Sequence, residues 1–398
     1  MLPAGRSLAS RSLVALTLAA LALAGAGSHA AASPLIWVTP MQDGVATLAA
    51  DGRVTLHTGD RSATVLADAA RGDSLRLCEG QLLAIGADSH LRSLTGSTTG
   101  PRVSPHSRPA CLPGGRVIAV SADARSVLLL SPDLTVLARH PLDALPDGDP
   151  VPVGDAVALL SQPTQRYRHG VLGDEIEAGA VTLLRQDDLS PITTMTIAAP
   201  AVIEQRRVQA FPAAGNYGML LTRSTPSAGA GVEAVALEGG TLQVVASAPP
   251  IGAPDRWLNL FAASGDRAYA VQTPHRGGPF ERFTLTGGHL TVARYALDVT
   301  NHRVGSRNLD LALLLPPPMA GPRDVLALPT LDRKQVQLVA CDASSCTPEL
   351  VLSLNAPLTS NLAAQWRGSQ LVLDAGEADG TLQRFTLDAS LWSAAGGR

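Results

Sequence analysis

The amino-acid sequence predicts an all-β fold, and three observations carry this prediction. Short apolar runs recur from Pro34 to the C-terminus, and Gly, Asp, Asn and Pro residues separate them at near-regular intervals. The apolar spacing of amphipathic helices is almost absent, and 37 Gly and 29 Pro residues would break helices in any case. Short runs bounded by turn residues are typical of β-sandwiches, barrels and propellers.

Two neighbouring segments, 78–88 and 111–123, form an internal repeat. Each begins at a Cys, passes a Gly, enters an apolar run and ends at an Asp. Apolar runs recur along the chain at roughly 35 to 60 residues, and a period of about 40–50 with four strands per unit favours a β-propeller. We therefore predict one β-propeller over residues 31–398, built from four-stranded antiparallel blades. Seven blades are preferred, six or eight are alternatives, and two packed β-sandwich domains are the second choice.

The individual strands follow from runs that are too short for an ordinary helix and are bounded by turn residues. The central strands of the units are expected at 45–50, 156–160, 217–222, 267–271, 309–315, 325–328 and 370–373. Companion strands are expected at 54–57, 90–95, 126–131, 134–140, 181–184, 231–237, 280–285 and 382–387. The region 140–189 is irregular and includes a charged insertion, 162–179. Insertions of that length are usually functional or disordered.

Residues 1–30 have the pattern of a cleavable secretory signal peptide. Arg6 and Arg11 precede the uncharged apolar run 13–24, and small residues at 28–32 offer a cleavage site. The apolar run is shorter than the roughly 20 residues that span a bilayer. We expect a periplasmic or secreted protein of bacterial type, with no transmembrane segment after cleavage.

The net charge of −3 indicates no excess of basic residues that would bind nucleic acid, so no nucleic-acid partner is expected.

Four cysteines in an oxidising compartment predict disulfides. Cys341 and Cys346 flank a tight turn between two strand-like runs. Cys78 and Cys111 occupy equivalent places in neighbouring repeats, so we predict the pairs Cys341–Cys346 and Cys78–Cys111. Four cysteines allow three connectivities, and the other two stay possible at this stage.

Four pieces of the middle of the chain occur in an order that resembles a known family. They are 167–179, 249–258, 268–275 and 300–305. The first resembles a segment of bacterial exported proteins with FG-GAP/VCBS-type repeats, which are similar to the integrin α-chain propeller. The resemblance covers about residues 165–310 and implies a propeller. Family repeats carry Asp-x-Asp-x-Asp-Gly calcium loops, but the corresponding turn here, 262–267, keeps only Asp266. One carboxylate does not hold calcium, so we predict no bound metal and no cofactor.

Candidate functional residues form three polar clusters and one isolated arginine. They are His169, Asp174, Glu175 and Glu177; Asn301, His302 and Arg303; His275; and Arg256. Because all lie within the resembling pieces, we predict that they contribute to one ligand or partner face, with His169, Arg256, His275 and His302 converging. The alternatives are local hydrogen bonds and Arg–carboxylate pairs in the first cluster, an inter-blade latch in the second, and an exposed turn around His275.

No catalytic motif is present: the chain has neither a Gly-x-Ser-x-Gly elbow nor a phosphate loop. The sequence therefore favours an exported, non-catalytic scaffold in the bacterial envelope that binds an envelope protein or a small ligand. The alternatives are an extracytoplasmic propeller hydrolase with a metal or acid/base site on its channel face, and an envelope-assembly scaffold.

Overall fold

The computed structural model describes residues 32–70, 75–318 and 323–392. Within these ranges there is no α-helix. Four short 3₁₀ turns occur at Pro113–Gly115, Pro212–Ala214, Pro274–Arg276 and Ala389–Trp392. The remaining regular structure is antiparallel β-sheet, as the sequence predicts.

The first three sheets each have four strands. Their bounds are β1 (Leu35–Met41), β2 (Gly44–Ala49), β3 (Val54–Thr58) and β4 (Arg61–Leu66); β5 (Arg76–Cys78), β6 (Gln81–Ile85), β7 (His90–Ser93) and β8 (Thr98–Arg102); and β9 (Ala110–Cys111), β10 (Val117–Val120), β11 (Ser126–Leu130) and β12 (Val136–Pro141).

The next sheet has nine strands and combines two four-stranded groups. The first group is β13 (Val151–Val153), β14 (Ala156–Thr164), β15 (Glu177–Arg185) and β16 (Pro191–Thr196). The second group is β18 (Gln209–Ala210), β19 (Met219–Thr225), β20 (Gly229–Glu238) and β21 (Thr241–Ser247). The short strand β17 (Val202–Ile203) pairs with both β15 and β19 and thereby joins the groups.

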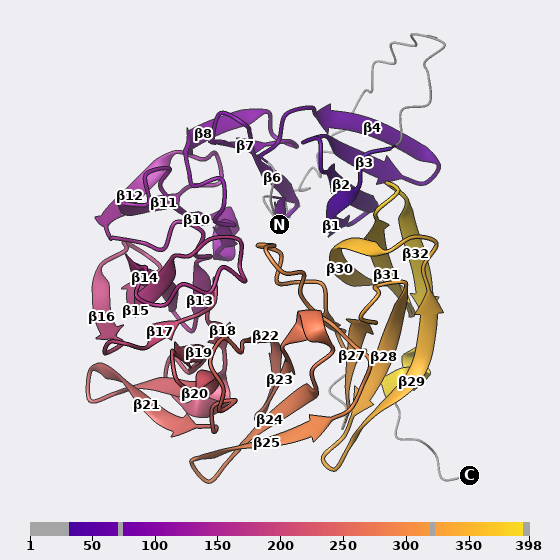
Figure 1. Cartoon of the computed structure of the whole chain (residues 1–398). Helices are drawn as coiled ribbons and strands as arrows, with labels where there is room; N and C mark the ends of the chain where they lie inside the picture. The colour runs from indigo at the N-terminus through magenta and orange to yellow at the C-terminus, as the bar shows by residue number, and fades with distance from the viewer. Residues whose placement is uncertain (1–31, 71–74, 319–322, 393–398) are drawn as a thin grey trace, which may run out of the picture. The chain divides into compact units, whose positions relative to one another are not determined.

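Three sheets complete the chain. They are β22 (Leu258–Ser264), β23 (Arg267–Gln272), β24 (Phe280–Thr286) and β25 (His289–Tyr295); β26 (Leu313–Leu314), β27 (Asp324–Pro329), β28 (Gln335–Cys341) and β29 (Cys346–Ser353); and β30 (Leu358–Arg367), β31 (Gln370–Glu377) and β32 (Leu382–Leu387). Within residues 33–392, Figure 1 shows the sheets following one another in chain order around a common centre. Four-stranded antiparallel sheets repeated around a centre are the architecture of a β-propeller. The preferred number of seven blades stays a prediction.

The apolar core lies between successive sheets. Trp37 and Leu48 of the first sheet pack with Leu82 of the second, and Leu91 of the second packs with Leu128 of the third. Both faces of each sheet are therefore covered by a neighbour, which explains why β2 is buried along its whole length. Among the described residues, no helix is long and apolar enough to cross a bilayer.

Both predicted disulfides are present: Cys78 is bonded to Cys111, and Cys341 to Cys346. The first connects β5 to β9, and thus two neighbouring sheets. The second closes the hairpin of β28 and β29. The prediction from equivalent repeat positions is therefore confirmed.

One expected strand is largely wrong. The run 309–315 was expected to be a central strand, but only Leu313–Leu314 forms one. Asp310 instead turns its carboxylate to Arg108, in the loop before β9, and to Arg207, in the loop between β17 and β18. These tertiary contacts hold the backbone before β26 in an extended loop rather than in a sheet.

Asn361 of β30 joins the last described sheet to the first. Its side chain accepts a hydrogen bond from the Val38 amide at 2.7 Å and donates one to the Val38 carbonyl at 2.8 Å. Both residues are buried, so water cannot easily replace these bonds. The link connects residues 323 positions apart in the chain.

We expect Asn361→Leu to lower the free energy of unfolding by about 1–3 kcal/mol, because it leaves a buried amide and a buried carbonyl of Val38 without partners. Urea denaturation measures this difference. Asn355→Leu, at an exposed position before β30, is the matched control and should unfold like the wild type. Equal stability of the two variants would show that the link contributes nothing.

Candidate functional site

The segment 296–312, between β25 and β26, lies in the centre of the ring of sheets (Figure 1). Its contacts reach several sheets. The Gly305 amide donates to the Val171 carbonyl at 2.9 Å, and the Leu362 amide donates to the Asp310 carbonyl at 3.1 Å. We call 296–312 the central segment. It contains three of the predicted site residues, Asn301, His302 and Arg303. The contacts of this segment therefore determine whether these side chains can reach a ligand or partner.

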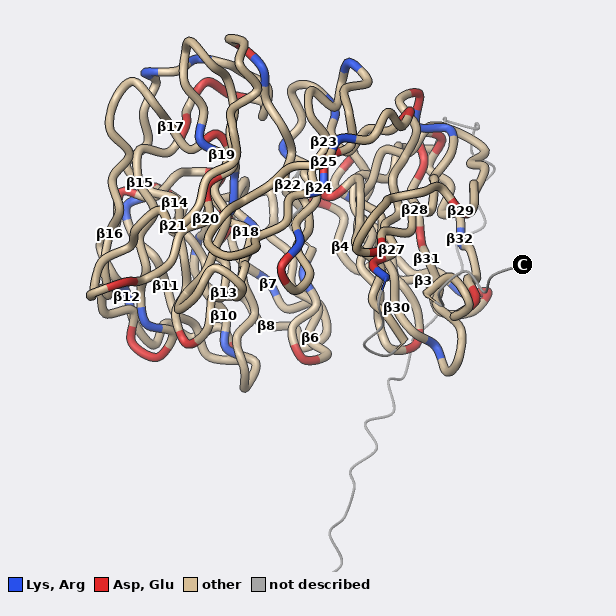
Figure 2. Tube along the Cα trace, turned by 90° about the horizontal axis from the view of Figure 1, so that it is seen from below, with Lys and Arg blue, Asp and Glu red and all other residues tan. Residues whose placement is uncertain are grey.

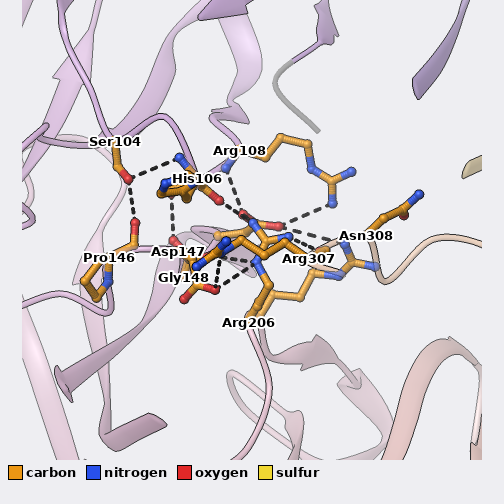
Figure 3. A network of polar contacts seen from close by, with 12 residues as sticks. Ser104, His106, Arg108, Pro146, Asp147, Gly148, Arg206, Arg307 and Asn308 are labelled. Carbon is orange, nitrogen blue, oxygen red and sulfur yellow. Dashed lines mark hydrogen bonds and ion pairs between the residues drawn. The ribbon is translucent and has the colours of Figure 1, made fainter. Parts of the chain in front are cut away.

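Arg206 anchors the central segment from the nine-stranded sheet (Figure 3). Its side chain is 1% exposed. The guanidinium donates to the Asp147 carbonyl at 2.9 Å, to the carbonyls of Arg307 and His106, and to the Asp149 carboxylate at 3.3 Å. One buried cation thus connects three separate loops and stabilises their relative positions.

Arg307 of the central segment completes this part of the network. Its guanidinium contacts the Asp147 carboxylate at 3.3 Å and the Asp174 carboxylate at 2.7 Å. Desolvation raises the pKa of Asp147 to about 6, although the charge of Arg206 opposes the rise. Asp147 is therefore a carboxyl that gains a proton on mild acidification.

A second group of charges surrounds Asp310. Arg108 donates to this carboxylate at 2.9 Å and Arg207 at 3.0 Å. Burial opposes ionisation of Asp310, but the charges of Arg207 and Arg108 and their hydrogen bonds outweigh it. The pKa of the carboxyl therefore lies well below its ordinary value. Asp310 is an anion at every pH at which the protein would function.

The first predicted cluster does not act as a unit. His169 Nδ1 lies 2.5 Å from Glu204 Oε1, and this hydrogen bond is the main cause of a raised His169 pKa. Asp174 pairs with Arg307, whereas Glu175 is exposed and lies 3.9 Å from Arg168. The expected Arg–carboxylate pairing within the loop thus holds for Glu175 but not for Asp174.

Glu177 and Arg166 also differ from the expectation of a loop cluster. Glu177 is the first residue of β15 and is buried, which raises its pKa well above the ordinary value, and the nearby Glu204 raises it further. Arg166 donates to the carbonyls of Ile197 and Ala201 rather than to a carboxylate. Glu177 therefore lies too deep to contact a partner directly.

The second predicted cluster lies on the central segment but is mostly internal. His302 is 1% exposed, and its Nε2 lies 2.8 Å from the Ser306 carbonyl. Its ring meets the Trp257 ring edge-on at 4.8 Å between centroids. Desolvation lowers the pKa of His302 to about 4, so the ring is neutral.

Asn301 is buried beside His302 and forms a reciprocal pair with Asn259 of β22. The Asn301 amide donates to the Asn259 carbonyl at 2.9 Å, and the Asn259 amide donates to the Asn301 carbonyl at 3.1 Å. These contacts join the central segment to β22. Neither Asn301 nor His302 can therefore belong to an exposed partner face.

Of the four residues expected to converge, His275 and His302 line the same cavity, whereas His169 and Arg256 are not among its lining residues. Desolvation lowers the pKa of His275, and the charges of Arg276, His169 and Arg256 lower it further. The charge of His275 in turn acts on His302. Pieces of the chain that are more than a hundred residues apart thus lie near His275, and His302 forms the floor of the cavity rather than its surface.

This cavity has a volume of about 270 Å³. It is lined by His275, Thr300, His302, Arg303, Val304, Leu331 and Arg333. Val304 is 65% exposed, the highest value among the exposed large apolar side chains of the described residues, and Leu331 beside it is 40% exposed. We call Arg303, Val304, Leu331 and Arg333 the contact face.

Sequence reasoning missed Glu204 and Arg206, which bond to His169 and to the central segment. Glu204 and Arg206 belong to the short charged run 204–207, which stands between two apolar stretches and was the available signal. In Figure 2, basic and acidic residues are interspersed along the described trace without a face of a single sign. Within the described ranges, no group of three or more His, Cys, Asp or Glu residues is placed to hold a metal ion.

Neither a family model nor a curated protein matches the sequence. Solved structures match over most of the chain. The computationally designed Ika8 protein aligns with a TM-score of 0.55 at 9% identity, covering 89% of this chain and 96% of its own. Sqt1 from Saccharomyces cerevisiae has a TM-score of 0.53 at 9% identity, with 90% and 96% covered. BamB from Moraxella catarrhalis has a TM-score of 0.50 at 12% identity, with 88% and 96% covered.

At such identities the likeness shows the fold alone, and the fold is a β-propeller. The expected fold class is therefore confirmed. The narrower resemblance to FG-GAP/VCBS-type repeats gains no support from these comparisons.

Proposed function

We propose that this protein is an exported, non-catalytic β-propeller that binds a protein of the bacterial envelope through the contact face. The observation that carries the proposal is the pair of exposed apolar side chains, Val304 and Leu331, beside Arg303 and Arg333. Apolar anchors next to arginines are common where proteins bind one another. An FG-GAP/VCBS-type origin of the propeller is part of this proposal.

The rigidity of the central segment supports the same function. Val304 lies between the buried His302 and Arg307, whose carbonyl accepts from Arg206. A loop held at both ends loses little conformational entropy when a partner binds, which favours affinity. The partner that fits is a protein with an apolar group flanked by carboxylates, because the neighbouring charges of the contact face are positive.

The hydrolase alternative would require His169, His302 and a carboxylate at one accessible site. His169 is instead bonded to Glu204, and His302 to the Ser306 carbonyl. No observation favours this alternative over the binding scaffold.

We expect Val304→Asp to weaken partner binding at least tenfold, because it places a carboxylate at the apolar centre of the contact face. Affinity capture from envelope fractions with the chain 31–398 identifies the partner, and titration with the purified partner measures the loss. Val244→Asp on β21 is the control, because Val244 is 45% exposed but lies on another sheet. Equal binding by the two variants would contradict the assignment of the contact face.

Export is tested separately. Residues 1–30 lie outside the described part of the chain, so the signal peptide stays a prediction. Cell fractionation of the full chain should recover a protein shortened by about 30 residues outside the cytoplasm. Recovery of the full-length chain in the cytoplasm would contradict export without affecting the binding test.

A further inference from the structure

A second cavity, of about 460 Å³, lies at the inner ends of β1, β5 and β30. Its volume falls in the range of small-molecule sites. One part of the wall is apolar and includes Trp37, Leu75 and Leu362. The other part carries charged groups, namely Arg76, Arg108, Arg207 and Asp310. An apolar wall with a few convergent polar groups is the usual composition of a ligand pocket.

The charged groups beside this cavity form a network of ion pairs. Arg108 and Arg207 pair with Asp149 and Asp310, and Arg206 and Arg307 pair with Asp147, Asp149 and Asp174. The charges of Asp310 and Asp149 act on Arg76, but no described carboxylate forms an ion pair with it.

Arg76 is the arginine of this wall without a direct ion pair among the described residues. Arg108 and Arg207 share the Asp310 carboxylate, whereas no described residue accepts a hydrogen bond from Arg76. The Arg76 Nε is buried without a partner among the described residues. Desolvation lowers the pKa of Arg76 to about 10, and the charge of Arg108 lowers it further. A desolvated cation without a counter-ion is costly unless a ligand supplies one.

Further contacts keep the neighbouring arginines in place. The Arg108 guanidinium stacks over the Trp37 ring at 5.0 Å from the centroid and pairs with Asp149 at 3.5 Å. Arg207 also lies 3.9 Å from Asp149. Arg76 is thus the guanidinium of this wall that is available to a ligand.

We propose that this cavity binds a small organic monocarboxylate with an apolar body. The carboxylate pairs with the Arg76 guanidinium, whose planar fork suits bidentate recognition. The apolar body packs against the wall that includes Trp37 and Leu362. This site is independent of the contact face.

The test uses the chain 31–398 and three monocarboxylates as probes: octanoate, phenylacetate and N-acetyl-leucine. Each is compared with its neutral amide by isothermal titration calorimetry. We expect at least one acid to bind and its amide to bind at least tenfold more weakly. Failure of all three acids to bind would overturn the proposal, and so would equal binding of an acid and its amide.

Two variants locate the site. Arg76→Gln should lower the affinity for the bound acid at least tenfold, while Arg102→Gln, at an exposed arginine of β8, should leave it unchanged. Ala364→Phe should block the acid by filling the apolar part of the cavity while Arg76 is intact. If Arg76→Gln does not fold, Arg76→Lys keeps the charge but not the fork and should bind more weakly than the wild type. Undiminished binding by the Arg76 variants or by Ala364→Phe would overturn the assignment.

Discussion

Replacing Arg206 with Met should lower the free energy of unfolding by about 3–5 kcal/mol, the usual cost of removing one partner from a buried ionic network. The change leaves the carboxylates of Asp147 and Asp149 without their buried cation. It also removes the guanidinium that donates hydrogen bonds to the carbonyls of His106 and Arg307. Urea denaturation followed by tryptophan fluorescence measures the loss.

Arg303→Met is the control for Arg206→Met. Both replace an arginine near the centre of the ring, but Arg303 is exposed and belongs to the contact face. A surface substitution of this kind usually changes stability by less than about 0.5 kcal/mol. If both variants unfolded like the wild type, the network around Arg206 would not hold the central segment.

The strands could be predicted from the sequence because each depends on a local pattern. The runs expected at 45–50 and 325–328 are β2 and β27 within one or two residues. Cys78–Cys111 could be predicted because equivalent positions of neighbouring repeats lie side by side, and Cys341–Cys346 because both residues flank one tight turn. The run 309–315 has an equally apolar pattern, but Asp310 binds two arginines from loops distant in the sequence, and no local pattern reports such contacts.

The candidate site was predicted only in part for the same reason. Of the residues that the resemblance marked, His275 and His302 line one cavity, whereas His169 bonds to Glu204 outside its lining. The resemblance does not indicate how deeply each side chain is buried. The buried Asn301 and His302 could therefore not be distinguished from the exposed Arg303. Arg206 and its partner Arg307 are 101 residues apart, and their contact follows from the ring rather than from the sequence around either residue.

The pH dependence of stability should reveal how deeply His302 is buried. Its pKa is about 4 in the folded protein, below the ordinary value of 6.5. The unfolded chain therefore binds more protons between these values, so the contribution of His302 is present above pH 6.5 and is lost as the pH falls toward 4. The difference of about 2.5 pKa units corresponds to about 3 kcal/mol.

Asp147 acts in the opposite direction over nearly the same range. Its pKa is raised from 3.8 to about 6, so its contribution is fully present below pH 3.8 and is lost as the pH rises through 6. The difference also corresponds to about 3 kcal/mol. In the wild type, the pH dependence that His302 gives to the free energy of unfolding opposes the one that Asp147 gives. A curve of wild-type stability against pH would therefore show neither contribution clearly.

Comparing His302→Gln with the wild type separates the two groups. The stability advantage of the wild type over this variant should shrink by about 3 kcal/mol between pH 6.5 and 4, because only the wild type must protonate a buried imidazole. Urea denaturation at each pH measures the advantage, and His289→Gln, at an exposed position of β25, should show no such change. An advantage that is constant with pH would mean that the His302 ring reaches solvent. The central segment would then not be sealed against the Trp257 ring, and the rigid anchoring of the contact face would fail with it.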